Sequence, residues 1–151
     1  MLLWLADFLA QYYLGISPRD LQQKSIDELY GALISQWNFI YQRKPKEYKV
    51  KVYNPELEQH GWQSSHTVIQ IIHENKPFIL DSIRVALNRI DINVRLIIHA
   101  EGIRFIRDIN GNIQKIIALD MHDKSNAVKD SSIIEAPIYI EIDRQSDSIM
   151  L

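Results

Sequence analysis

The sequence predicts an α+β protein, in which an N-terminal helical arm precedes an antiparallel sheet that has one helix between its strands. Apolar residues recur at helical spacing up to Pro45, and strand-like patterns follow it. Of the 151 residues, 46% are hydrophobic and 24% are charged, as in a soluble globular protein with a core. This length suits one domain of ordinary size, or a small domain with an extra helical layer.

Residues 1–45 are predicted to form the helical arm. Ser17 precedes Pro18, a residue favoured at the first position of a helix. Ser25 and Glu28 have the spacing of a capping box, which predicts that a second helix begins there. Its apolar face includes Trp37, which we expect to anchor the arm onto the sheet.

Residues 46–62 are predicted to form an edge strand and a turn connector. Val50 and Val52 alternate with Lys49 and Lys51, and lysines on an edge strand discourage pairing with another sheet. The dipeptide at 54–55, Asn-Pro, then predicts a turn.

Residues 63–151 are predicted to form the main domain. SHTVIQIIH has the β-branched, two-faced apolar pattern of a central strand, and the helix after it should begin at Pro77. Residues 91–108 read as one long strand with a bulge at Gly102. The Asn110-Gly111 pair predicts a hairpin in which both residues have positive φ, followed by the returning strand NIQKIIAL.

The end of the chain indicates an incomplete unit. Residues 120–135 form a polar connector, APIYIEID reads as another strand, and Ser146 or Asp147 would cap a helix that has only begun at Leu151. The order strand-helix-strand-strand is most of a ferredoxin-like β-α-β-β unit that lacks its last helix and strand. We therefore expect a fragment with an uncovered apolar sheet face or edge, and hence dimerisation or domain swapping of the isolated piece.

Composition argues against several classes of partner. The net charge of −2 gives no basic surface for nucleic acid or an anionic membrane, so neither is expected as a partner. The absence of cysteine removes thiolate chemistry and fits a reducing cytoplasm. The apolar start, MLLWLADFLAQYYLG, has no basic segment before it and is too short to span a bilayer.

No catalytic or metal site is predicted. His60, His66 and His73 lack the spacing of zinc ligands, and no glycine-rich phosphate loop occurs. Asp81 and Ser82 fit the polar side of a first helical turn; a hydrolase that uses Asp81 with His66 or His73 is the alternative. A further cluster along residues 95–107 reads as a solvated, charge-balanced sheet face, and its members are Arg95, Arg104 and Arg107.

Four motifs stand between residues 51 and 99: VYNP, HGWQSSHT, PFILDS and LIIH. Together they closely resemble the amino-terminal region of the large, multidomain NAD-specific glutamate dehydrogenases of bacteria. RDINGNI, IYIEIDRQSD and the helical segment from Ser17 to Trp37 are similar to that family as well. The resemblance implies a structural role for the family-signature residues Asn54, Pro55, His60, Gly61, Trp62, His66, Thr67 and His99.

The family has ACT-like domains in this region, which are ferredoxin-like modules that pair and bind small effectors near a strand-to-helix loop. ENKPFILDSI resembles the D-x-P-G-L-L opening of that helix, with Phe78 in place of a glycine that would let a ligand approach the backbone. The resemblance therefore implies a candidate effector or interface loop, which consists of Glu74, Asn75, Lys76, Pro77, Phe78, Asp81 and Ser82.

By resemblance, the parent enzyme converts L-glutamate, NAD and water to 2-oxoglutarate, ammonia and NADH. The implied role of this chain is an N-terminal regulatory or assembly domain without a cofactor of its own. NAD would bind elsewhere in the parent. Expected partners are the rest of the parent chain, further copies of it and an amino-acid effector. The alternative is a free-standing ACT-like sensor of amino acids.

Overall fold

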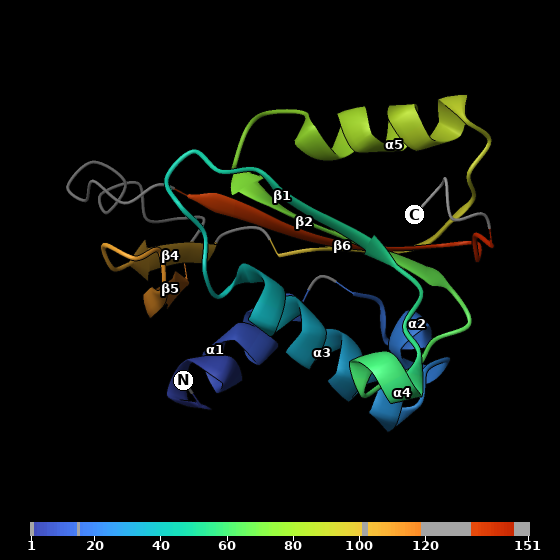
Figure 1. The fold of residues 1–151 in the computed structure, drawn as a ribbon, viewed down its shortest axis with the longest axis horizontal. Helices are drawn as coiled ribbons and strands as arrows, with labels where there is room; N and C mark the ends of the chain where they lie inside the picture. The colour runs from blue at the N-terminus through green and yellow to red at the C-terminus, as the bar shows by residue number, and fades with distance from the viewer. Residues whose placement is uncertain (1, 15, 101–102, 119–133, 147–151) are drawn as a thin grey trace.

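A computed structural model describes residues 2–14, 16–100, 103–118 and 134–146 (Figure 1). The elements in chain order are α1 (Leu2–Tyr12), α2 (Pro18–Gln22), α3 (Ile26–Ile40), β1 (Lys49–Tyr53), α4 (Leu57–His60), β2 (Thr67–Glu74), α5 (Ile79–Arg89), β3 (Val94–His99), β4 (Ile103–Arg107), β5 (Ile113–Ala118) and β6 (Glu135–Ile142). None of the described helices is both long and apolar enough to cross a membrane.

The main sheet has four strands in the order β1-β2-β6-β3, and all of its neighbours are antiparallel. Helix α5 joins β2 to β3, and β6 lies between these two strands, which is the split β-α-β arrangement. Strand β1 pairs with the other side of β2 and forms one edge of the sheet. The predicted α+β class with an antiparallel, ACT-like unit is confirmed.

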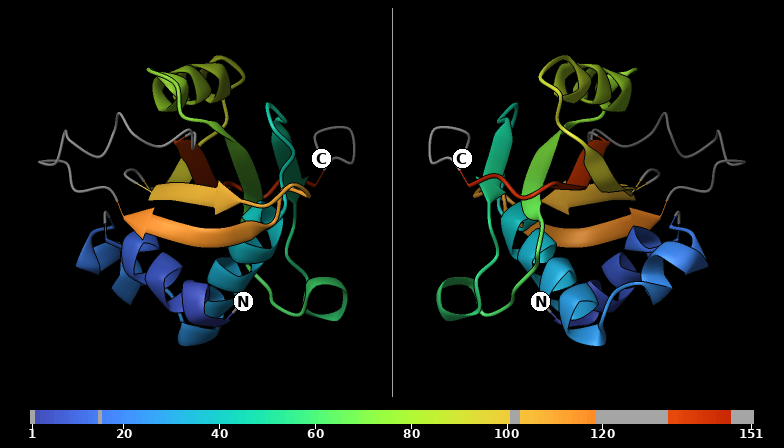
Figure 2. Two further views of the ribbon diagram at one scale, coloured as in Figure 1. Left: turned by 90° about the vertical axis from the view of Figure 1, so that its left-hand side faces the viewer. Right: turned by 90° about the vertical axis from the view of Figure 1, so that its right-hand side faces the viewer.

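The two faces of this sheet are covered differently (Figure 2). The helical arm packs on one face and forms the larger core, which contains Phe8, Trp37, Val68, Ile72 and Tyr139. Helix α5 covers the other face above Ile69, Ile138, Ile140 and Ile142. None of the residues of α5 is fully buried, so this layer is held less tightly than the arm.

The predicted strand over residues 91–108 is wrong, because β3 and β4 belong to two different sheets. Strand β4 pairs with β5 in a hairpin beside the helical arm (Figure 1). Ile103 and Phe105 join the larger core there, and burial of these side chains explains why the chain leaves the main sheet after β3. The bulge predicted at Gly102 and most of the connector at 120–135 lie outside the described residues.

The hairpin turn has only one of its two predicted positive φ angles, at Gly111. The carboxylate of Asp108 accepts hydrogen bonds from the backbone N–H groups of Asn110 and Asn112, both at 2.9 Å. These bonds favour a longer turn that ends in a left-handed glycine. A Cβ on Gly111 would also lie 2.4 Å from the carbonyl oxygen of Arg43, so the close approach requires glycine as well.

The predicted serine caps at Ser17 and Ser25 are both present, whereas the helix predicted after Ser146 lies outside the described residues. Ser17 Oγ accepts a hydrogen bond from the N–H of Asp20 at 3.2 Å, and Ser25 Oγ accepts one from Glu28 at 3.1 Å. The predicted start of α5 at Pro77 is wrong, because the helix begins at Ile79. Phe78 has a φ of 63°, and this left-handed conformation cannot be part of the helix.

Buried tyrosines predict a loss of stability in alkali. Burial raises the pKa of both Tyr12 and Tyr139, and the negative charge of Glu141 adds to the effect at Tyr139. Both phenols therefore stay neutral in the fold at a pH where they ionise in the unfolded chain. The free energy of unfolding should be unaffected below about pH 10 and fall above it by about 1.4 kcal/mol per pH unit for each phenol. Urea unfolding at several pH values measures this slope.

Tyr12→Phe is the matched variant for that measurement. The Tyr12 hydroxyl has no hydrogen-bond partner among the described residues, so its removal should cost little at neutral pH. The alkaline slope should become shallower in this variant. An unchanged slope would show that Tyr12 ionises equally in the folded and unfolded states.

Candidate functional site

The loop that joins β2 to α5 borders a pocket of about 380 Å³. Five residues of the predicted effector or interface loop line it, and these are Asn75, Lys76, Pro77, Phe78 and Asp81. The other two do not: Glu74 ends β2, and Ser82 lies in the first turn of α5, where its N–H bonds the carbonyl of Phe78 at 2.9 Å. His99, at the end of β3, completes the pocket. Sequence reasoning gave His99 only a structural role, because β3 lies some twenty residues further along the chain.

Phe78 is the unusual residue of this loop. Its side chain is 77% exposed, and its backbone has the left-handed conformation that glycine adopts without strain. A left-handed non-glycine residue costs about 1–2 kcal/mol, and such strain is concentrated at functional sites. An exposed aromatic ring held in this way makes the loop a candidate contact surface.

The structure does not bring a catalytic set together at this loop. His73 stacks on Tyr48 with ring centroids 3.3 Å apart, and the Nδ1 atom of His66 lies 3.6 Å from Glu141. Neither histidine lines the pocket that contains Asp81. Across the described residues, no group of three histidine or carboxylate side chains is placed to hold a metal ion. His122 lies outside the described part of the chain.

The HGW motif forms the end of α4 and the compact turn that follows it. Gly61 has a φ of 77° and ends this short helix in the left-handed conformation. His60 Nδ1 accepts a hydrogen bond from the N–H of Glu56 at 2.9 Å, and its ring lies 4.8 Å from that of Tyr53. Trp62 is buried against Gly31 of α3, where a Cβ would lie 2.5 Å from the Trp62 Cβ. The motif therefore fixes the connection between β1 and β2 onto the helical arm.

Gly31→Ala should destabilise the protein by about 1–3 kcal/mol, because the added methyl group must displace Trp62. Alanine gains about 1 kcal/mol in helix propensity over glycine, which offsets only part of the overlap. Urea unfolding measures the difference. Gly31→Ala combined with Trp62→Gly is the control, compared with Trp62→Gly alone. Glycine at position 62 removes both the Cβ and the ring that the new methyl group would meet, so the alanine at position 31 should then be tolerated. A stabilised single variant would contradict the close contact.

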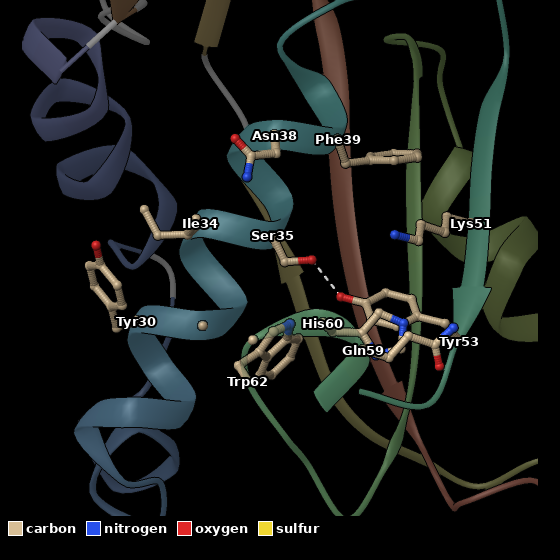
Figure 3. A pocket seen from close by; sticks show the side chains of 12 residues that line it. Tyr30, Ile34, Ser35, Asn38, Phe39, Lys51, Tyr53, Gln59, His60 and Trp62 are labelled. Atoms are coloured by element: carbon tan, nitrogen blue, oxygen red, sulfur yellow. Dashed lines mark hydrogen bonds between the residues drawn. The ribbon is translucent and has the colours of Figure 1, made fainter. Parts of the chain in front are cut away.

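A second pocket, of about 430 Å³, lies between α3, β1 and this turn (Figure 3). Ser35 and Tyr53 point toward each other there, and their hydroxyl groups are hydrogen-bonded. Gln70 Nε2 donates to Ser35 Oγ at 3.0 Å. Burial raises the pKa of Tyr53, although hydrogen bonds with Ser35 and Trp62 oppose the change. The sequence did not suggest this pocket, because its residues come from separate elements.

The signature residues Asn54, Pro55 and Thr67 lie at the end of the sheet where β1 ends and β2 begins. Thr67 Oγ1 donates to Asn54 Oδ1 at 2.5 Å, and Asn54 Nδ2 donates to the carbonyl of Gln145 at 2.9 Å. The N–H of Gln145 donates in turn to Thr67 Oγ1 at 2.8 Å. These bonds connect the end of β1, the start of β2 and the segment after β6. Pro55 is buried beside them, and the structural role of these positions in the family stays a prediction.

Buried ion pairs are the main feature that sequence reasoning missed. Glu135 accepts from Arg43 Nε at 2.5 Å and from Arg107 Nε at 2.9 Å. Glu141 accepts from Lys24 Nζ at 2.6 Å. The predicted solvated arginine face is therefore wrong for Arg107, and also for Arg104, which is 4% exposed. These partners are far apart in the sequence, so no local pattern reveals them.

Comparison with known proteins connects this architecture to one family. Residues 8–151 match the family model described as glutamate dehydrogenase, ACT1 domain. The NAD-specific glutamate dehydrogenase of Halomonas elongata is 40% identical over 136 residues, which cover 90% of this chain and 8% of that protein. The enzyme of the same name from Pseudomonas aeruginosa is 33% identical over 137 residues, covering 91% and 8%.

The chain thus spans about 8% of the length of these curated relatives. No solved structure matches it. The match covers almost the whole chain, including the split sheet, the β2–α5 loop and the HGW turn. This chain belongs to the ACT1 domain family of glutamate dehydrogenases.

Proposed function

We propose that this chain is an N-terminal regulatory and assembly domain of a large cytoplasmic NAD-dependent glutamate dehydrogenase. That enzyme would convert L-glutamate, NAD and water to 2-oxoglutarate, ammonia and NADH in another part of its chain. The observation that carries the proposal is the family match over residues 8–151, together with relatives of which the chain spans only 8%. The domain itself takes no part in the chemistry.

The regulatory element is the pocket of the β2–α5 loop. Lys76 and the carboxylate of Asp81 supply both signs of charge in its lining, and His99 adds a polar side chain from β3. A small zwitterion such as an amino acid would find complementary groups there. Because α5 has no fully buried residue, a ligand that contacts its first turn can shift this helix against the sheet.

A thermal-shift series over the amino acids tests ligand binding by the 151-residue chain. An effector should raise the melting temperature with a saturating dependence on its concentration, since binding to the folded state stabilises by about 2.7 kcal/mol at a hundredfold excess over Kd. Lys76→Ala should abolish the response, and Lys115→Ala on β5 is the matched control. A response that Lys76→Ala leaves intact, or none with any amino acid, would contradict the regulatory role.

The same chain incubated with L-glutamate and NAD should form no NADH above the buffer rate. Absorbance of the reduced nicotinamide measures this directly. Turnover by the isolated chain would overturn the assignment of catalysis to another part of the enzyme.

The proposed assembly role rests on exposed strand edges and exposed apolar side chains. Strands β1 and β3 are at the edges of the sheet, and the large side chains of Val50, Phe78, Val85 and Ile90 are exposed by half or more. Such edges and patches are typical of surfaces that pair with another copy or another domain. Light scattering after size exclusion should report a dimer or larger species. Val85→Lys on α5 should shift it toward monomer; a concentrated monomeric chain would count against self-assembly.

A further inference from the structure

The pocket between α3 and β1 lies on the face that carries the helical arm, whereas α5 and the 75–81 loop lie on the other face (Figures 1 and 3). Its volume of about 430 Å³ falls within the range of small-molecule sites. It shares no lining residue with the loop pocket. A ligand here would therefore be separate from the proposed amino-acid effector.

The charge of this pocket has one sign. Its described lining includes the cation of Lys51 but no aspartate or glutamate, although the protein as a whole has a net charge of −2. The ammonium group of Lys51 lies 4.4 Å from the centroid of the Tyr53 ring, so a cation–π contact holds it at the pocket. A fixed cation without a neighbouring carboxylate in the lining favours an anionic ligand.

The hydroxyl pair supplies a hydrogen-bond donor beside this cation. Gln70 donates to Ser35 Oγ, and one hydroxyl hydrogen is used between Ser35 and Tyr53. Two hydroxyl groups carry two hydrogens, so the second is left for an acceptor outside the pair. Burial raises the pKa of the Tyr53 phenol, so this group remains a donor at neutral pH.

The lining beside the hydroxyl pair is aromatic. Trp62 is held against Gly31, and the rings of Tyr53 and Trp62 lie 6.4 Å apart with an interplanar angle of 76°. Figure 3 shows Trp62 beside the Ser35–Tyr53 pair. Such a wall favours a flat apolar group next to the anionic one.

We propose that this pocket binds a small organic carboxylate with a flat apolar body. Its carboxylate accepts from Lys51 Nζ and from the Ser35–Tyr53 hydroxyl pair, and its apolar body contacts Trp62. The proposal does not depend on amino-acid binding at the β2–α5 loop, because the two pockets share no residues.

A ¹H–¹⁵N NMR titration of the 151-residue chain with sodium benzoate tests this. Saturable shifts are expected at the Trp62 indole N–H and at the amides of residues 31–35 and 51–53. Benzamide, which has the same shape without the charge, should bind at least about tenfold more weakly, as loss of a charge-assisted hydrogen bond predicts. Shifts confined to residues 75–82, or equal affinity for benzamide, would overturn the proposal.

Four variants make the test specific. Lys51→Met keeps the apolar stem on an exposed edge strand and should weaken benzoate binding about tenfold, whereas Lys51→Arg should retain most of it. Tyr53→Phe keeps the ring and removes the hydroxyl, and it should weaken binding as well. Lys115→Met on β5 is the matched control and should bind like the unmodified chain. Unchanged binding in Lys51→Met would exclude this pocket as the anion site.

Discussion

Glu135→Ala should destabilise the protein by about 3–5 kcal/mol, the cost of removing one partner from a buried ion pair. Its carboxylate is shared by two arginines, and the side chains of Glu135 and Arg43 are 2% and 4% exposed. Arg107 also donates to the carbonyl groups of Ile40, Tyr41 and Gly111, so the cluster joins the end of α3 to the hairpin and to β6. Without Glu135, two buried cations lose the carboxylate that they share.

Arg43→Met is the informative comparison for this prediction. It leaves Glu135 paired with Arg107, so the remaining pair is neutral and the loss of stability should be smaller than in Glu135→Ala. Urea unfolding of both variants measures the order. Since natural domains have only about 5–15 kcal/mol of stability, Glu135→Ala should approach the limit of folding at 37 °C. Equal losses in the two variants would mean that charge balance does not determine the effect.

Elements with a local signal could be predicted from the sequence. Ser17 and Ser25 cap their helices through bonds within four residues. The alternating apolar residues of β1 and the β-branched, two-faced apolar run of β2 indicate a sheet from the local sequence alone. The fold class follows from the order of such elements. The predicted domain boundaries at 45 and 62 remain predictions, although β1 pairs with β2 in the same sheet.

Features that depend on long-range contacts could not be predicted. Lys49 was expected to protect an edge strand, yet its Nζ donates to the carbonyls of Phe39 and Gln42 at 2.6 and 2.7 Å. Desolvation lowers its pKa in this position at the end of α3. The departure of β4 from the main sheet likewise depends on a core to which α1 and α3 contribute. In both cases the deciding partner lies in another element.

The contrast between local signals and long-range contacts applies to the candidate site as well. The loop at 74–82 could be found because the family resemblance marks it, and five of its predicted residues do share a pocket. The pocket of Lys51 and Tyr53 could not be found, because the HGW motif indicates a turn but not the helix against which it packs. Gly31 is the residue that could have suggested this pocket. Glycine lowers the stability of a helix, so its presence within α3 indicates that a neighbouring group occupies the space of a side chain.

Trp37→Ala should cost about 3–5 kcal/mol, because it leaves a large cavity where the helical arm meets the sheet. Trp37 is 1% exposed, and its ring lies 5.4 Å from Phe8 of α1 and 6.0 Å from Tyr41. Removing the ring removes the contact between Phe8 of α1 and Trp37 of α3, so amides of α1 should exchange with solvent faster than those of β2. Urea unfolding and hydrogen exchange measure the two effects.

Trp37→Phe distinguishes packing from hydrogen bonding at this position. The indole N–H of Trp37 has no hydrogen-bond partner among the described residues, so phenylalanine loses volume but no bond. Its cost should therefore be well below that of alanine, and α1 should stay protected. If Trp37→Phe were as destabilising as Trp37→Ala, the indole N–H would have to make a bond that stabilises the fold. If neither variant loosened α1, the arm would be held by its other contacts, and Trp37 would not be its anchor.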